Sequence, residues 1–169
     1  MFGRFLTLTL LLFLPQVVYS DQQAPTLPRQ PSQWLDTAPM TWRELKGKVV
    51  LLNVWTFGCW NSYRSLPWLV SLRTKFPDLK IIGVHSPEFE WEKNRGKLKQ
   101  TMSRYKIDYP QLLDDDHSYW KSLRNSYWPS FYLVDKQGRI RSSYAGETHA
   151  GDAQARAVEE AIKTLLGEP

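Results

Sequence analysis

The residues best suited to chemistry in this sequence are Cys59 and Ser62, three positions apart in the segment CWNS. Cys59 is the only cysteine in the chain, and its thiolate would be a strong nucleophile. An apolar run and a short turn precede it, and apolar residues at helical spacing follow it. We therefore expect Cys59 at a helix N-terminus. The unpaired backbone N–H groups and the dipole of such a terminus favour the thiolate. The sequence therefore predicts a reactive cysteine.

Ser62 lies one helical turn beyond the cysteine. Its hydroxyl is expected to donate a hydrogen bond to the Cys59 sulfur and to hold the thiolate. Ser62 cannot resolve a mixed disulfide, so a degenerate site that keeps only its shape remains an open alternative. For Cys59 the alternative is a buried core cysteine, but its place between Trp55 and Trp60 favours exposure and reactivity. The Trp60 ring beside the sulfur would suit an apolar or peptide partner better than a small charged one.

Hydrophobic spacing predicts the elements that position the cysteine. Residues 49–55 form a nearly continuous apolar run, which is typical of a strand buried on both faces. Helical spacing extends over 60–76, and the run LKIIGV at 79–84 predicts a second buried strand. The strand, helix, strand order favours a parallel pair, and a crossover helix is expected at about 92–106. The loop after the second strand should then lie at the same sheet edge as Cys59.

The rest of the chain completes an α/β pattern. Segments 130–135 and 140–144, joined by a turn with glycine, predict a hairpin. Asp152 can cap a final helix, and the run Asp114 to Asp116 can cap the helix that it precedes. This run lacks the loop spacing of a calcium site. The expected fold class is therefore α/β, with a central mixed β-sheet flanked by helices.

The N-terminus is typical of an export signal. Arg4 provides a positive start, residues 5–14 are apolar, and Ser20 ends a segment with residues tolerated at cleavage sites. An uncleaved membrane anchor is the alternative, but the apolar stretch is shorter than the roughly 20 residues that span a bilayer. We expect a periplasmic or secreted protein with a signal peptide at 1–20, an extended proline-containing linker at 21–38 and one domain at 39–169.

Composition narrows the classes of function. The formal net charge is +5 without a dense block of Lys and Arg, which disfavours a nucleic-acid partner. His85, His117 and His149 have no ligand partner nearby in the sequence, so we expect no metal and no cofactor. Eight Trp, eight Tyr and seven Phe exceed what burial requires in a domain of this size. Some of these rings are therefore expected at a binding surface.

Three stretches carry a family resemblance: GKVVLLNVWTFGC, GVHSPEF and YWPSFYLVDKQGRIR. They resemble the TlpA-like periplasmic branch of thioredoxin-fold proteins, especially the carboxy-terminal thioredoxin-like domain of DipZ-type disulfide reductases. The resemblance covers roughly residues 39 to 166 and implies a thioredoxin fold. It departs at one decisive place, because that family has CxxC and this chain has CxxS, with Ser62 in place of the second cysteine.

The resemblance also implies roles for further residues. The peptide bond between Trp128 and Pro129 would be cis and would face Cys59, where the backbone of that loop can pair with a partner chain. Trp60, Trp128 and Pro129 would then bind the substrate. The match favours Glu88 as a proton relay to the cysteine over an ordinary loop residue, and it favours His85 less.

These features predict thiol and disulfide chemistry on periplasmic proteins, with Cys59 and Ser62 as the catalytic residues. A second thiol, on the substrate or on another protein, would release the mixed disulfide. Contact with a membrane is expected only through an uncleaved signal segment. A non-catalytic thioredoxin-like binding module is one alternative, and a one-cysteine peroxidase is another. Thr56 stands three residues before the cysteine, as in peroxiredoxins, but Leu52 stands where those enzymes have proline.

Overall fold

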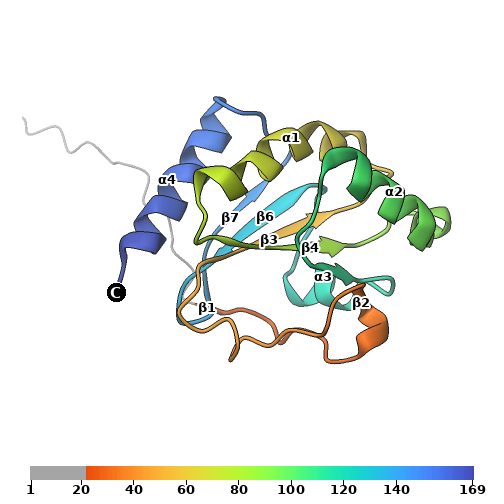
Figure 1. Cartoon of the computed structure of the whole chain (residues 1–169), viewed down its shortest axis with the longest axis horizontal. Helices are drawn as coiled ribbons and strands as arrows, with labels where there is room; N and C mark the ends of the chain where they lie inside the picture. Colours follow the sequence, from red (N-terminus) through yellow and green to blue (C-terminus); the bar gives the residue numbers. More distant parts are fainter. Residues whose placement is uncertain (1–21) are drawn as a thin grey trace, which may run out of the picture.

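The computed structural model describes residues 22–169, in which seven strands form one mixed sheet with helices on both faces (Figure 1). The strands follow the order β1-β7-β6-β3-β4-β5-β2 across the sheet. Their bounds are β1 Gln22–Gln23, β2 Trp34–Leu35, β3 Val50–Trp55, β4 Lys80–His85, β5 Gln111–Leu113, β6 Ser130–Val134 and β7 Arg139–Ala145. The helices are α1 Trp60–Lys75, α2 Arg95–Tyr105, α3 Ser118–Ser122 and α4 Ala153–Gly167, with 3-10 turns η1 Pro31–Gln33 and η2 Glu90–Lys93. The expected mixed sheet flanked by helices is confirmed.

β3 is the central strand of the sheet. It pairs in parallel with β4, from Val50 opposite Lys80 to Trp55 opposite His85, and it pairs antiparallel with β6. β5 continues the parallel set on the other side of β4. The parallel pair expected from the strand, helix, strand order is therefore confirmed. The carboxyl ends of β3, β4 and β5 meet at one edge of the sheet, where sites commonly assemble.

Two apolar layers cover the sheet. Leu51 and Trp55 of β3, both 0% exposed, pack with side chains of α1, α2 and α4 on one face. Leu52 and Val54 pack on the other face with α3 and the N-terminal segment. Successive side chains of a strand point to opposite faces, so a continuous apolar run serves both layers. Each such buried side chain stabilises the fold by about 1.5–3 kcal/mol relative to exposure. Within residues 22–169, no helix is long and apolar enough to cross a membrane.

The segment expected to be an extended linker is instead part of the packed structure. β1 pairs with β7 at one edge of the sheet, and β2 pairs with β5 at the other. Leu27 and Trp34 are only 2% and 4% exposed, and the Trp34 indole donates to the Pro28 carbonyl at 2.9 Å. The prolines keep this segment extended, but the apolar residues among them decide its packing. Residues 22–38 are therefore not a free tether, and the expected signal peptide at 1–20 lies outside the described residues.

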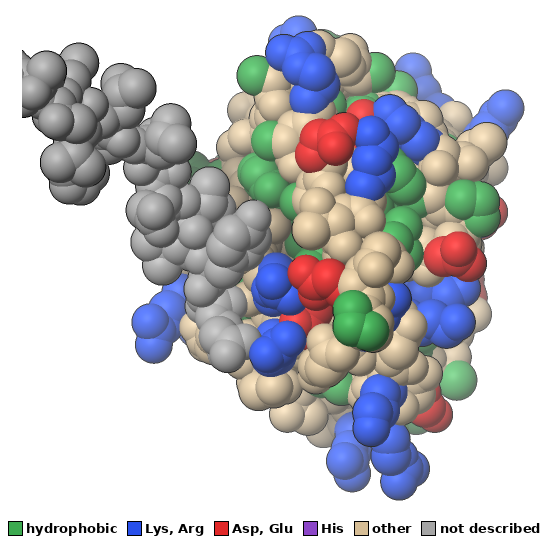
Figure 2. Space-filling model, turned by 90° about the vertical axis from the view of Figure 1, so that its left-hand side faces the viewer, with side chains coloured by type: hydrophobic (Ala, Val, Ile, Leu, Met, Phe, Trp, Pro, Cys, Tyr) green, Lys and Arg blue, Asp and Glu red, His purple; other side chains and the backbone are tan. Residues whose placement is uncertain are grey.

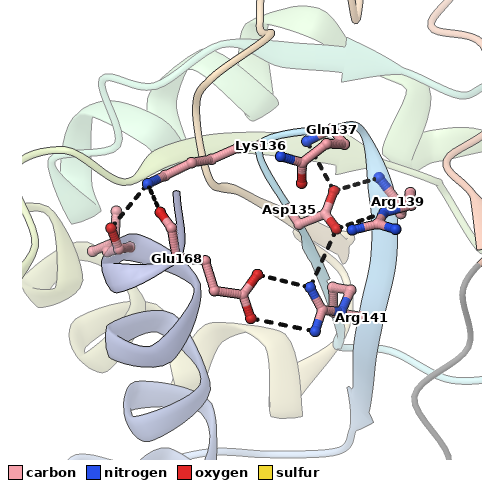
Figure 3. Close-up of polar contacts among 7 residues, drawn as sticks. Asp135, Lys136, Gln137, Arg139, Arg141 and Glu168 are labelled. Atoms are coloured by element: carbon pink, nitrogen blue, oxygen red, sulfur yellow. Dashed lines mark hydrogen bonds and ion pairs between the residues drawn. The ribbon is translucent and has the colours of Figure 1, made fainter.

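A buried carboxylate ties the β6–β7 hairpin to the end of α4 (Figure 3). Asp135 accepts hydrogen bonds from the backbone N–H groups of Gln137 and Arg139, each at 2.9 Å. Arg141 bridges Asp135 at 3.3 Å and Glu168 at 2.8 Å. Burial acts to raise the pKa of Asp135, but the bonds from Arg139 and Gln137 outweigh it and lower the pKa. Basic and acidic side chains are interspersed over the face drawn in Figure 2.

Both helix caps expected from the sequence are present. Asp152 accepts the N–H of Ala155 at 2.6 Å at the start of α4. Asp114 accepts the N–H groups of Tyr119 and Trp120 at 2.8 and 2.9 Å at the start of α3. Burial raises the pKa of Asp114 despite these bonds. The caps fix where both helices begin, and α3 in turn supports the functional site.

Candidate active site

Cys59 lies at the junction between the end of β3 and the start of α1. The strand ends at Trp55, a short turn follows, and α1 begins at Trp60 with Cys59 as its N-cap, at φ −86° and ψ 120°. The Cys59 carbonyl accepts the N–H of Tyr63 at 3.2 Å, which closes the first helical turn. The thiol is free and the residue is partly exposed. The predicted place of the cysteine at a helix N-terminus is confirmed.

The Cys59 thiol faces a loop from a distant part of the chain. Its Sγ donates a hydrogen bond to the carbonyl oxygen of Trp128 at 3.8 Å. The peptide bond between Trp128 and Pro129 is cis, and β6 begins directly afterwards. Since β6 runs antiparallel to β3, the start of β6 and the end of β3 lie at the same edge of the sheet. The fold therefore brings three of the expected site residues together: Cys59, Trp128 and Pro129.

Side chains from two other elements hold Trp128 in place. Its indole N–H donates to the Ser86 carbonyl at 2.9 Å. Its ring centroid lies 4.2 Å from that of Trp120 and 6.2 Å from that of His117. Asp114 accepts the Ser86 hydroxyl at 2.7 Å and also caps the helix that carries Trp120. Reasoning from the sequence missed this support, because its members lie in three separate segments with no shared motif.

Ser62 does not donate a hydrogen bond to the sulfur, contrary to expectation. It is 1% exposed, and its Oγ has no hydrogen-bond partner among the described residues. The expectation rested on the spacing of one helical turn between the two residues. As the N-cap, Cys59 has an extended backbone instead, and its thiol bonds to Trp128. The spacing of one helical turn therefore did not produce the expected hydrogen bond.

The carboxylate beside the cysteine turn belongs to Glu92 and not to Glu88. Glu92 lies in η2 and is 1% exposed. Its Oε2 accepts the hydroxyl of Thr56 and, at 2.8 Å, the backbone N–H of Glu88. Glu88 is exposed, so the residue expected to relay a proton contributes a backbone donor to this cluster. The sequence signal for Glu92 was its place in the same loop, within the aromatic segment EFEWEK.

Gly58 leaves the space that the Glu92 carboxylate occupies. A Cβ atom at Gly58 would overlap with Oε1 of Glu92 and would crowd the ring of Trp91. Oε1 has no hydrogen-bond partner in the part of the chain that the structure describes. The backbone directly before Cys59 therefore packs on a buried carboxylate with one unpaired oxygen.

His85 ends β4 and is buried beneath the cysteine turn. Its ring stacks on Phe57, with centroids 5.4 Å apart and an interplanar angle of 14°, and meets Trp55 edge-on at 5.6 Å. Among residues 22–169, no group of three or more His, Cys, Asp and Glu side chains is arranged to hold a metal ion. Burial lowers the pKa of His85 to about 3. The imidazole is therefore neutral at neutral pH and is a poor proton relay.

Four exposed aromatic side chains lie in the three segments that meet at the cysteine turn, and we call them the aromatic rim. Its members are the exposed large hydrophobic residues of the described chain: Trp60 at 70%, Tyr127 at 65%, Phe89 at 54% and Trp91 at 51%. Trp60 follows Cys59, Tyr127 precedes Trp128, and Trp91 lies against Gly58. The Phe89 ring stacks on Trp91, with 6.5 Å between centroids. Some of the aromatic residues that the composition has in excess are therefore exposed in the segments next to Cys59.

Comparison with known proteins places these features in a family context. The family model described as "AhpC/TSA family" matches residues 21–143. Protein DipZ of Mycobacterium tuberculosis is 38% identical over 140 residues, which are 80% of this chain and 19% of DipZ. The thiol-disulfide oxidoreductase YkuV of Bacillus subtilis is 29% identical over 137 residues, which are 80% of this chain and 88% of YkuV. The chain thus spans about a fifth of DipZ.

Solved structures share the fold. The crystal structure of the thioredoxin-like superfamily protein SPOA0173 has a TM-score of 0.75 and 25% sequence identity, and the match covers 88% of this chain and 98% of that chain. This match confirms the thioredoxin fold that the sequence resemblance implied.

Proposed function

Because this chain belongs to the AhpC/TSA family and is similar to TlpA-like thiol-disulfide oxidoreductases, we propose that it carries out thiol–disulfide exchange on other proteins through Cys59. It would be a monothiol member with CxxS in place of CxxC. The contact of the Cys59 thiol with the Trp128 carbonyl, at 3.8 Å, carries the proposal. It leaves the sulfur partly exposed beside a loop whose backbone can receive a partner chain.

In the proposed reaction, the Cys59 thiolate attacks one sulfur of a partner's disulfide. A bond forms between Cys59 and that sulfur, the partner's S–S bond breaks, and the second sulfur leaves as a thiolate that takes up a proton. An outside thiol, on the substrate or on another protein, then attacks the mixed disulfide and releases Cys59. The outside thiol is required because Ser62 cannot act as a resolving residue. This role is closer to a reductase or an isomerase than to an oxidase.

The aromatic rim supports a polypeptide substrate. Exposed apolar rings next to a reactive group favour apolar surface on the partner, and a small charged thiol would gain little from them. We assign substrate binding to Trp60, Trp128 and Pro129, which flank the sulfur in the chain or across the site. The substrate class that fits is a protein segment with apolar side chains near its disulfide.

Two other functions use the same features differently. A non-catalytic binding module would keep the aromatic rim, and the serine in place of a resolving cysteine favours it. A one-cysteine peroxidase is less well supported. The hydroxyl of Thr56, the residue shared with peroxiredoxins, is buried and donates to Glu92.

We further propose that the protein acts in the periplasm or outside the cell, after cleavage of the signal peptide at 1–20. An oxidising compartment supplies partner disulfides. With one cysteine, this chain forms no disulfide of its own, so its thiol stays available for exchange.

Trapping of mixed disulfides tests the proposed function. Cells that export the wild type or Cys59→Ser are quenched with acid and a thiol-blocking reagent, and the captured proteins are identified. We expect partners that are attached to the wild type, released by reductant and absent with Cys59→Ser. Capture of the same partners by both proteins without a covalent bond would support the binding module. Consumption of peroxide by the wild type alone would support the peroxidase.

A further inference from the structure

A hollow of about 190 Å³ lies beside the loop that faces Cys59. Its walls come from the segment after α3, the start of β6 and the end of β7, and they include Arg124, Tyr127 and Ser143. Sites for small molecules usually measure about 300–1,000 Å³. The hollow therefore suits a side chain of a polypeptide better than a separate small molecule.

Hydrogen bonds tie the hollow to the loop that meets the thiol. The side-chain amide of Asn125 donates to the Tyr127 carbonyl at 2.9 Å, and the Ser130 hydroxyl donates to the same carbonyl at 2.8 Å. Tyr127 immediately precedes Trp128, whose carbonyl accepts the Cys59 thiol at 3.8 Å. Since consecutive Cα atoms are about 3.8 Å apart, a polypeptide bound at the sulfur reaches the hollow within a few residues.

Arg124 gives the hollow an uncompensated positive charge. It is the one charged side chain among the described residues that line the hollow. It is exposed and forms no ion pair within residues 22–169. Burial raises the pKa of Tyr132, another lining residue, to about 12, so this hydroxyl is neutral at neutral pH. The guanidinium is therefore available to a carboxylate from outside.

The backbone of Arg124 has a left-handed conformation, with φ at 52°. This is the position after a helix where glycine is common, because a side chain is strained there. Strained residues of this kind cluster at binding sites, where the side chain has a use that offsets its cost. The position also allows the charge to be removed by Arg124→Gly with no strain added to the fold.

The outer edge of β7 is open where it borders the hollow. β1 pairs with the first two residues of β7, and no strand within residues 22–169 pairs with the outer edge of residues 143–145. Ala145 lies opposite Ser130 at the start of β6, directly after the loop that faces Cys59. An open edge presents backbone N–H and C=O groups, to which an extended chain can add as a further strand.

We propose that Arg124 and the outer edge of β7 form a subsite for an extended, acidic segment of the partner protein, a role that rests on the exchange reaction proposed above. The segment pairs with residues 143–145, and one of its carboxylates binds Arg124. A guanidinium and a carboxylate can form two parallel hydrogen bonds, which fixes the register of the segment. The subsite thus selects disulfides that have Asp or Glu nearby in the partner's sequence.

Binding of two short fluorescein-labelled peptides to the purified protein tests the subsite. Both have the same strand-forming sequence around a central serine, which replaces cysteine so that no covalent step occurs, and they carry either glutamate or lysine beside it. We expect the wild type to bind the glutamate peptide roughly fivefold more tightly in fluorescence anisotropy, because Arg124 attracts one side chain and repels the other. Arg124→Gly should bind the two peptides about equally and should unfold in urea no more easily than the wild type.

Charge reversal supplies the matched control. Arg124→Glu should prefer the lysine peptide. Arg43→Glu makes the same change on an exposed arginine before the start of β3, whereas Cys59 follows the end of that strand, and it should keep the wild-type preference. No binding, equal binding or a lysine preference in the wild type would overturn the subsite, and so would a glutamate preference that survives in both Arg124 variants.

The same peptides with a central cysteine joined to a thiopyridyl group test the exchange reaction separately, because attack by Cys59 releases thiopyridone. Release without a preference for the glutamate peptide would overturn the subsite and leave the proposed function standing. A glutamate preference in binding without any release would overturn the proposed function and leave the subsite standing.

Discussion

The thiol of Cys59 donates its hydrogen bond to the backbone carbonyl of Trp128, at 3.8 Å. The indole N–H of Trp128 donates in turn to the carbonyl of Ser86, at 2.9 Å. The orientation of the nucleophile therefore depends on a loop from the second half of the chain and on the loop after β4. Cys59 is the N-cap of α1, but no side chain of that helix bonds to its thiol among the described residues.

Ser62→Cys should convert the site into one that resolves its own mixed disulfides. Ser62 is buried in the first turn of α1, three residues after Cys59. We expect a thiol there to form a disulfide with Cys59 once the Cys59 thiol leaves the Trp128 carbonyl. We expect a reversible intramolecular disulfide and roughly tenfold faster reduction of insulin with an added reductant.

Ser71→Cys is the control for that variant, because it adds a thiol on an exposed position of the same helix, far from Cys59 in sequence. Its turnover should equal that of the wild type. If Ser62→Cys forms the disulfide and is still no faster, the scaffold lacks more than a resolving thiol. The binding module would then be the better description.

Trp128→Phe should loosen the loop that faces the thiol. The substitution keeps an aromatic ring beside Trp120 and removes the donor to the Ser86 carbonyl. We expect the free energy of unfolding in urea to fall by about 1 kcal/mol, and capture of partners to weaken. Trp60→Phe, at an exposed residue, should change stability by less than about 0.5 kcal/mol. Unchanged stability and capture in Trp128→Phe would show that the hydrogen bond does not hold the loop.

His85 should make the fold sensitive to mild acid. Its pKa in the folded state is about 3, lowered by burial, and the unfolded value is about 6.5. Between these two pH values the unfolded chain binds a proton at His85 that the folded chain does not bind. The stability that neutral His85 contributes above about pH 6.5 is therefore lost as the pH falls, by up to about 1.4 kcal/mol per pH unit. In His85→Phe, the free energy of unfolding measured in urea should change less with pH between about pH 6.5 and pH 4 than it does in the wild type. His149→Phe, at an exposed histidine, should keep the pH dependence of the wild type. If His85→Phe keeps it too, the acid sensitivity does not come from His85.

Asp135→Asn should weaken the junction between the hairpin and α4. Burial acts to raise the pKa of Asp135, but its hydrogen bonds to Arg139 and Gln137 lower it overall. The ionised carboxylate therefore adds stability above about pH 4, and this stability is lost as the pH falls through the lower folded pKa. We expect Asp135→Asn to lower the free energy of unfolding by about 2 kcal/mol at neutral pH.

Urea titrations at neutral pH and near pH 3 check this prediction, since the difference between Asp135→Asn and the wild type should shrink in acid. The control is Asp78→Asn, at an exposed turn residue, which should match the wild type at both pH values. A constant difference at both pH values would mean that the shape of Asp135, and not its charge, stabilises the junction.

The sequence by itself determined the strand, turn and helix around Cys59, the parallel pairing of β3 and β4, and the hairpin and caps that complete the sheet. These features depend on hydrophobic spacing and on turn and cap residues that are close together in the chain. The aromatic excess also predicted a binding surface. The prolines before residue 39 led to the expectation of an extended linker, because composition indicates that a segment is stiff but does not show what it packs against.

Only the tertiary structure decided which groups meet the sulfur. Ser62 is near Cys59 in sequence, but the extended backbone at the N-cap directs the thiol to Trp128. Glu92 is far from Cys59 in sequence, but the crossing from β4 to α2 buries its carboxylate against Gly58. Local spacing sets the direction of a side chain only within one regular element. Across a turn, long-range packing and the need to satisfy buried polar groups choose its partners.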